Sequence, residues 1–157
     1  MKFKNAIVKK PSKKMVAGIS TANLGKPNYK KALKQHKNYI KALRECGVEV
    51  EILEEDENYP DSMFVEDPAI VTEKCAIITN LGAESRKGEE KEIKKVLKKY
   101  HSQNIHEIKA PGILEGGDVM QVEDHFYIGI SERTNKNGAK QLLNFLEKYN
   151  YSGTIVE

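Results

Sequence analysis

The sequence predicts an α/β fold built from a repeating unit of about fifty residues. Three lysine-rich segments carry apolar residues at helical spacing, and each leads into a short segment in which apolar and polar residues alternate. The helix and the following strand are predicted at residues 29–46 and 48–53, at 89–100 and 105–108, and at 138–149 and 154–156. A change in period from 3.6 to 2 residues is typical of α/β proteins.

Pairs of short strands are also predicted before the second and third helices, at residues 68–71 with 75–78 and 118–122 with 126–128. Arg86 and Arg133 each follow one pair, and the helix cores recur in register, with Leu97 matching Leu146. A strand–strand–helix–strand unit of this length cannot bury its apolar face alone. We therefore expect one partial domain over residues 1–157, with repeats at approximately 1–58, 59–109 and 110–157.

The composition fits a soluble globular protein. Of the 157 residues, 31% are charged and 39% are hydrophobic, which argues against disorder. The sequence contains neither an apolar run near the ~20 residues that span a bilayer nor a signal-peptide core. Cys46 and Cys75 are the two cysteines, so a disulfide framework is not expected, and the cytoplasm is the expected compartment.

The net charge of +3 conceals an asymmetry along the chain. Residues 1–44 contain twelve lysines and Arg44 but no acidic residue, whereas residues 45–157 contain 13 basic and 23 acidic residues. A basic segment can contact nucleic acid, but the aromatic residues needed for base stacking are not interleaved here. We favour a solvated lysine surface and expect no nucleic-acid or membrane partner.

Two groups of carboxylates lie at the starts of predicted strands. The first contains Asp61, Glu66 and Asp67, and the second contains Glu115 and Asp118 on either side of two glycines, which allow close backbone approach. An unpaired ion at the end of a buried strand costs several kcal/mol, so these acids need partners. The partners can be Arg86 and Arg133, which follow the two strand pairs, or a cationic ligand.

Metal and phosphate sites are not indicated. The sequence lacks an Asp-x-Asp-x-Asp-Gly loop, and its histidines lack zinc-site spacing: His36, His101, His106 and His125. The Gly116-Gly117 pair is not part of a phosphate-binding loop. We expect neither a metal ion nor another cofactor.

Three strings of residues carry a resemblance to a known family. Residues 59–67 (YPDSMFVED), 113–119 (ILEGGDV) and 129–135 (GISERTN) closely resemble dimethylarginine dimethylaminohydrolases and their relatives among arginine deiminases and amidinotransferases. The resemblance implies a pentein fold, a five-bladed α/β propeller around a central site, of which about three blades are present here. The repeat deduced from periodicity agrees with such a blade.

The resemblance also implies roles for individual residues. Glu66 and Asp67 match acids near the substrate guanidinium, which a carboxylate holds through paired, charge-assisted hydrogen bonds. Asp61 matches an acid near the α-ammonium group, and Arg86 and Arg133 match the arginines that hold the α-carboxylate. Each charge of an arginine-like amino acid therefore has an expected counterpart.

Two further residues have expected roles by the same resemblance. Leu24 matches a leucine of a lid loop whose backbone carbonyl faces the ligand, and Glu115 matches the acid that orients a catalytic histidine. In relatives that histidine follows the third repeat and a nucleophilic cysteine lies much later, so both are expected to be missing here. We do not expect Cys46 or Cys75 to replace the nucleophile.

These expectations define the predicted function. The chain should be the N-terminal part of a hydrolase that converts methylated arginine, or arginine, to citrulline and an amine, and should not turn over alone. An incomplete array of blades should pair with the C-terminal part or with itself. Arginine deimination and amidino transfer remain alternatives, and so does a non-catalytic pentein module that binds a ligand or a protein.

Overall fold

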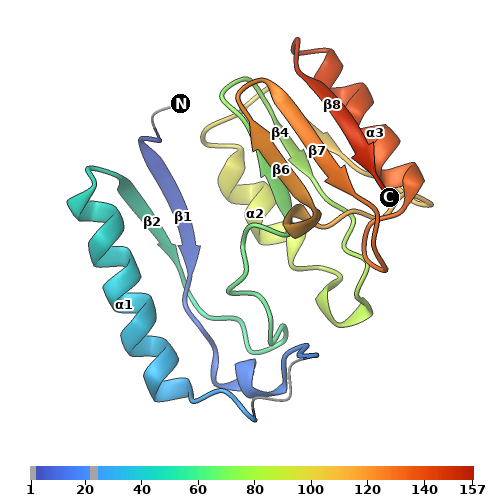
Figure 1. Cartoon of the computed structure of the whole chain (residues 1–157). Coiled ribbons are helices and arrows are strands. Elements are labelled where there is room, and N and C mark those ends of the chain that lie inside the picture. The colour runs from blue at the N-terminus through green and yellow to red at the C-terminus, as the bar shows by residue number, and fades with distance from the viewer. Residues whose placement is uncertain (1–2, 22–24) are drawn as a thin grey trace. The chain divides into compact units, whose positions relative to one another are not determined.

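The computed structural model describes residues 3–21 and 25–157 of the chain. The chain divides into two compact units, residues 1–65 and residues 66–157. Figure 1 shows that each unit combines helices with a parallel or mixed sheet. The predicted α/β class is therefore confirmed, while the boundaries assigned to the repeats remain a prediction.

The first unit is a single strand–helix–strand motif. Strand β1 (Asn5–Lys9) pairs in parallel with β2 (Glu49–Leu53), with Ala6 opposite Val50. The 3-10 helix η1 (Lys13–Ala17) and helix α1 (Tyr29–Glu45) connect them, and α1 packs against β2 (Figure 1).

Both ends of α1 follow known capping chemistry. The Asn28 side chain accepts a hydrogen bond from the backbone N–H of Lys31 at 2.9 Å, which satisfies one of the free donors of the first turn. At the other end Gly47 adopts a φ of +79°, and Val48 N–H bonds to the carbonyl of Leu43. This left-handed glycine cap ends the helix and directs the chain into β2.

The second unit contains two copies of the predicted strand–strand–helix–strand motif. The first copy comprises β3 (Ala69–Val71), β4 (Ala76–Ile78), the 3-10 helix η2 (Glu84–Arg86), α2 (Glu90–Leu97) and β5 (Ile105–Glu107). The second comprises the 3-10 helix η3 (Gly116–Asp118), β6 (Val119–Val122), β7 (His125–Gly129), α3 (Lys136–Glu147) and β8 (Ser152–Val156). In both sheets the first two strands are antiparallel and the last two are parallel.

A single apolar core joins the two copies. It combines residues of the first sheet, residues of the second sheet and the inner face of α3: Ile70, Cys75, Ile77, Ile108, Leu114, Phe126, Ile128, Ala139, Leu142, Leu146 and Tyr151. Each repeat therefore buries its neighbour's apolar surface, as a stacked array requires. The glycine at the start of α3 makes this packing possible, because a Cβ on Gly138 would lie 2.1 Å from the carbonyl oxygen of Ile113.

All three helices differ at their ends from the predicted ranges, by one to three residues. Helix α2 ends at Leu97 rather than at Tyr100, because tighter 3-10-type hydrogen bonds such as Tyr100 N–H to Leu97 O replace the helical ladder. Helix α3 begins at Lys136 rather than at Gly138, because Asn135 caps it by accepting from Gly138 N–H at 2.8 Å. The spacing of apolar residues locates the buried stripe but not the caps.

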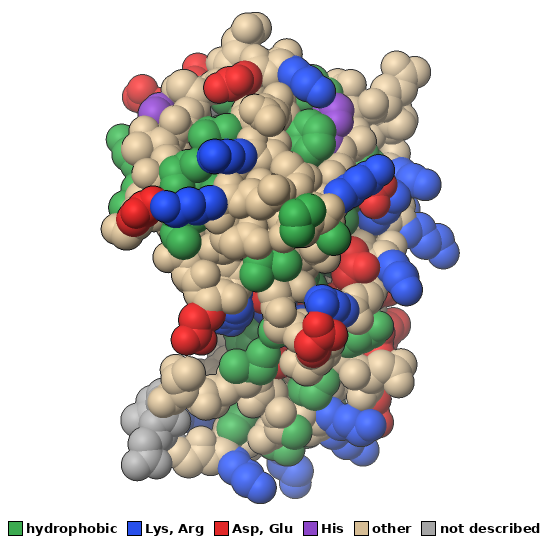
Figure 2. Space-filling model, turned by 90° about the vertical axis from the view of Figure 1, so that its right-hand side faces the viewer, with side chains coloured by type: hydrophobic (Ala, Val, Ile, Leu, Met, Phe, Trp, Pro, Cys, Tyr) green, Lys and Arg blue, Asp and Glu red, His purple; other side chains and the backbone are tan. Residues whose placement is uncertain are grey.

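Charged side chains of both signs lie on the face shown in Figure 2, with apolar side chains among them. Within residues 3–21 and 25–157, none of the helices has both the length and the apolar character needed to cross a membrane.

Candidate ligand-binding site

A buried arginine forms the centre of the candidate site in the second unit. Arg86, at the end of η2, is only 2% exposed. Its Nη1 donates to Asp67 Oδ2 at 2.5 Å, its Nη2 donates to Glu89 Oε2 at 2.8 Å, and its Nε lies 3.1 Å from both oxygens of Glu89. Burial alone would lower the pKa of Arg86, but hydrogen bonds to Glu89 and Asp67 outweigh burial and raise it. The guanidinium is therefore permanently charged and rigidly held.

The glycine pair predicted from the sequence brings a second backbone segment against Asp67. Gly117 N–H donates to Asp67 Oδ1 at 2.9 Å, and Gly116 N–H donates to the backbone carbonyl of Asp67 at 3.1 Å. A Cβ on Gly116 would lie 2.0 Å from the carbonyl oxygen of Glu66, so any other residue would force the segments apart. The expected close approach between the two acidic motifs is thus present.

Glu115 lies immediately before this glycine pair and is buried. Its Oε2 is 3.2 Å from Nη1 of Arg133, whose side chain is half exposed. Burial raises the pKa of Glu115, and the Arg133 charge opposes that rise. The backbone N–H of Glu115 donates to Thr134 Oγ1 at 3.1 Å, which fixes the start of η3. A buried, oriented carboxylate results.

Glu66 differs from its neighbour Asp67 in that its side chain lies at the surface. The surrounding protein nevertheless reduces its solvation and raises its pKa, and the Asp67 charge acts in the same direction. The backbone hydrogen bond of Glu66 and the Arg86 charge oppose these effects. A carboxylate whose charge is poorly solvated is suited to accept a cationic partner.

Glu66→Gln should stabilise the protein at neutral pH. The folded state binds a proton at Glu66 more readily than the unfolded chain, so ionisation of this group destabilises the fold as pH rises through the raised pKa. The gain in urea midpoint of the glutamine variant should shrink as pH falls towards the ordinary value of 4.5. An equal difference between the proteins at pH 4 and pH 8 would contradict this prediction.

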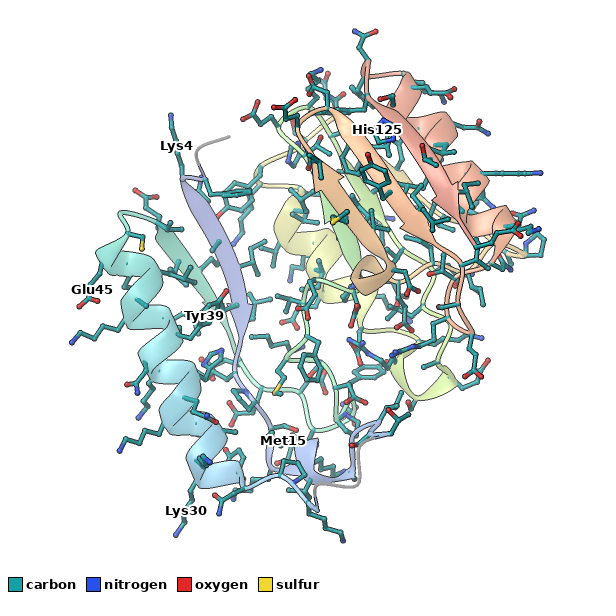
Figure 3. The ribbon with its side chains drawn as sticks, viewed as in Figure 1. Lys4, Met15, Lys30, Tyr39, Glu45 and His125 are labelled. Atoms are coloured by element: carbon teal, nitrogen blue, oxygen red, sulfur yellow. The ribbon has the colours of Figure 1, made fainter. Side chains whose placement is uncertain are left out.

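Asp61 belongs to the first unit. It is buried, and both of its carboxylate oxygens accept from Ile19 N–H, at 3.2 and 3.1 Å. It lines a pocket of about 560 Å³ together with Gly18, Ile19 and Phe64, and with Met15, which is labelled in Figure 3. Leu24 lies outside the described residues.

The structure brings four of the predicted residues of the second unit into one charge cluster: Asp67, Arg86, Glu115 and Arg133. Glu66 is close enough for the charges of Asp67 and Arg86 to act on it. The cluster also contains Glu89, which is 4% exposed and was not predicted. Its position three residues after Arg86, at the start of a helix, is the signal in the sequence that could have identified it.

The two thiols differ in access. Cys75 is fully buried, and burial raises the pKa of its thiol, whereas Cys46 is exposed at the end of α1. The thiolate is the reactive form, so burial and a raised pKa both protect Cys75.

Alkylation should therefore modify one thiol in the native protein. Iodoacetamide at neutral pH should label Cys46 within the time in which Cys75 stays unmodified, and urea should release Cys75 for labelling. Mass spectrometry of peptic peptides measures both rates. Rapid native labelling of Cys75 would refute its assignment to the core.

Across residues 3–21 and 25–157, no group of three or more His, Cys, Asp or Glu side chains is arranged to hold a metal ion. The acidic side chains Asp67, Glu89 and Glu115 of the cluster contact arginines.

The fold matches those of solved structures. A Cys-to-Ser mutant of DDAH from Pseudomonas aeruginosa, in complex with citrulline, superposes with a TM-score of 0.98 and 48% identity over 99% of this chain and 61% of that one. The N-terminal domain of ArgZ, a cyanobacterial arginine dihydrolase, has the same fold, with a TM-score of 0.82 over 96% of this chain and 56% of that one, at 17% identity. The class is thus the pentein-type α/β fold of arginine-modifying proteins.

The chain belongs to the N,N-dimethylarginine dimethylhydrolase family, whose eukaryotic profile matches residues 18–155. The N(G),N(G)-dimethylarginine dimethylaminohydrolase of P. aeruginosa is 49% identical over 98% of this chain and 61% of its own length. That of Streptomyces coelicolor is 35% identical over 90% of this chain and 55% of its own length. The resemblance predicted from the motifs is confirmed, and the chain spans between about one half and two thirds of these relatives.

Proposed function

We propose that this chain supplies the substrate-binding part of a hydrolase that cleaves dimethylarginine, or arginine, to citrulline and an amine. The observation that carries the proposal is the charge cluster of Asp67, Arg86, Glu115 and Arg133, in which Arg86 and Glu115 are buried and Arg133 is half exposed. Burying ionised groups such as Arg86 and Glu115 is costly unless their orientation serves a purpose. An arginine-like ligand presents charges that such a cluster can orient.

Each part of the ligand has a proposed partner. The guanidinium binds Glu66 and Asp67, the α-ammonium binds Asp61, and the α-carboxylate binds Arg86 and Arg133. By the same resemblance, the backbone carbonyl of Leu24 faces the ligand. Arg133 offers the more accessible guanidinium because it is half exposed. Arg86 already donates to Asp67 and Glu89 and is only 2% exposed, so it contributes a fixed positive charge.

The proposed chemistry follows from the polarity of the guanidinium carbon. A cysteine thiolate attacks this carbon, a histidine protonates the departing dimethylamine, and the C–N bond breaks. The histidine then removes a proton from water, which attacks the carbon and releases citrulline as the C–S bond breaks. Glu115 orients that histidine. Neither Cys46 nor Cys75 is proposed as the nucleophile, so residues 1–157 alone should not turn over.

The wider architecture is part of the same proposal. Two repeats stacked through one core, preceded by a strand–helix–strand unit, fit about three blades of a five-bladed propeller. The remaining part of such a hydrolase, or a second copy, is the proposed protein partner. Two cysteines without a disulfide suit the cytoplasm.

Calorimetric titration tests the binding proposal. We define the chimera as residues 1–157 followed by the part of the P. aeruginosa relative that lies beyond the region of similarity. Dimethylarginine and citrulline should bind the chimera and bind residues 1–157 only weakly. Tight binding by residues 1–157 alone would favour a non-catalytic binding module, and preference for arginine over dimethylarginine would favour a deiminase or an amidinotransferase.

A further inference from the structure

Thr134, just before α3, is a buried residue whose hydroxyl contacts the backbone of Glu115. Its exposed fraction is 0%, and its Oγ1 accepts a hydrogen bond from the Glu115 N–H at 3.1 Å. The neighbours of Thr134 contact the same segment: Arg133 Nη1 lies 3.2 Å from Glu115 Oε2, and Asn135 Oδ1 accepts from Ile113 N–H at 3.2 Å. Three consecutive residues therefore hold the segment that carries the Glu115 carboxylate.

The preceding repeat also contacts Glu115 and Arg133. The backbone N–H of Ala83 donates to Glu115 Oε1 at 3.5 Å. A Cβ on Gly82 would lie 2.8 Å from the Cα of Arg133, so a larger residue would push the two loops apart. The Glu115 carboxylate thus bonds to a backbone N–H of one repeat and pairs with a guanidinium of the next.

The backbone at Thr134 is held in place without its hydroxyl. The N–H of Thr134 donates to Ser131 Oγ at 3.2 Å, and its carbonyl accepts from Ser131 N–H at 3.0 Å. The N–H of Arg133 also donates to Ser131 Oγ, at 3.0 Å. Loss of the Thr134 hydroxyl should therefore leave the backbone of Arg133 in place and affect mainly Glu115.

Glu115 needs this hydroxyl because its own N–H is buried. The residue is 2% exposed, and a buried N–H that loses its acceptor is unfavourable. Without Thr134 Oγ1 the backbone of Glu115 should shift toward water or another acceptor. Such a shift also moves the carboxylate, whose two oxygens now contact Ala83 and Arg133.

We infer that Thr134 is a positioning residue for the Glu115 carboxylate, and through it for the histidine that this carboxylate orients in the proposed reaction. The inference rests on the proposed function and adds a residue to it. The Thr134 side chain is fully buried, so it reaches Glu115 but not the ligand. Its loss should therefore lower kcat and leave KM near the parent value.

Thr134→Val in the chimera tests the inference, because valine keeps the shape of the side chain and removes the acceptor. The kcat for dimethylarginine should fall by about tenfold or more, while KM and the affinity for citrulline stay within about twofold. Thr134→Ser retains the hydroxyl and should keep kcat within about threefold. An unchanged kcat in a folded Thr134→Val chimera, or an equal loss in the serine variant, would overturn the inference.

Thr72→Val is the matched control for losing a buried threonine hydroxyl. Thr72 is 4% exposed, and its Oγ1 accepts from Lys74 N–H and Cys75 N–H, at 3.1 and 3.0 Å, in the hairpin between β3 and β4. This variant should lose stability but keep kcat within about twofold. If it lowers kcat as much as Thr134→Val does, a general loss of structure explains both results and the inference is wrong.

A double-mutant cycle with Glu115→Ala separates positioning from a purely structural role. If Thr134 acts through the Glu115 carboxylate, adding Thr134→Val to Glu115→Ala should lower kcat by no more than about a further twofold. A second loss of about tenfold would show that Thr134 acts by another route, and the inference would be wrong.

Amide hydrogen exchange measures the hold on Glu115 without any reaction. In residues 1–157, the Glu115 N–H should exchange about tenfold or more faster in Thr134→Val than in the parent protein or in Thr134→Ser. If Thr134→Val does not fold, Thr134→Ala gives the same comparison. A parent chimera that forms no citrulline counts against the proposed function, whereas an unchanged exchange rate overturns the inference.

Discussion

Glu89→Ala should destabilise the protein by about 3–5 kcal/mol, measured as the free energy of unfolding in urea. The substitution removes the partner of Nε and Nη2 of Arg86 and leaves the guanidinium buried beside Asp67. Truncating one partner of a buried pair is costly, because the remaining charge stays in a poorly solvated place. Glu89→Gln should lose less, since the amide oxygen can still accept one hydrogen bond.

Glu107→Ala is the matched control for this experiment. Glu107 also pairs with a basic residue, Lys94 at 2.6 Å, but both side chains are partly exposed. An exposed ion pair contributes about 0–1 kcal/mol, so this variant should remain close to the parent protein. If Glu89→Ala unfolds with the same midpoint as Glu107→Ala, the buried pair does not hold Arg86 as the geometry indicates.

Asp67→Asn in the chimera should reduce kcat/KM for dimethylarginine by about 10- to 100-fold, because hydrogen bonds to charged groups contribute roughly 1.5–3 kcal/mol. Asparagine keeps the acceptor for Gly117 N–H but removes the negative charge that faces Arg86 and the proposed guanidinium. The fold should change little in shape. The loss should appear in both the affinity for citrulline and the rate of its formation.

Asp118→Asn controls for a charge change in the same segment. Asp118 accepts a hydrogen bond from the Ser131 hydroxyl at 2.7 Å and is not assigned to the ligand. Its asparagine variant should keep kcat/KM within about twofold of the chimera. A comparable loss in the two variants would mean that local structure, rather than the Asp67 charge, causes the effect.

The repeat could be predicted from the sequence because its signal is periodic. Helix stripes such as Ile93, Val96 and Leu97 recur at a fixed spacing, and the hairpins retain two-residue loops. Cap positions depend on single hydrogen bonds, such as the one from Gly138 N–H to Asn135, and periodicity does not report them. The helix ends were therefore predicted less well than the helices.

The sequence identified most residues of the candidate site but not which of their side chains form ion pairs. The motifs identified Asp67, Glu115 and Arg133, and the repeat identified Arg86, but the sequence could not decide whether their charges face one another or a ligand. The structure shows that the arginines already contact acids, and it adds Glu89. The ion pairs join residues 3 to 19 apart in the sequence, and no pattern in the sequence specifies them. The approach of the two acidic motifs joins Gly117 to Asp67, fifty residues apart, and the glycine pair indicated it in advance.

Citrulline formation from dimethylarginine by the chimera tests the central proposal most directly. The chimera should form citrulline and dimethylamine in equal amounts, and residues 1–157 alone should form neither product at the same concentration. Cooperative unfolding of the chimera and activity of the complete P. aeruginosa enzyme are the two controls. A folded chimera that binds no dimethylarginine and forms no citrulline would contradict the account.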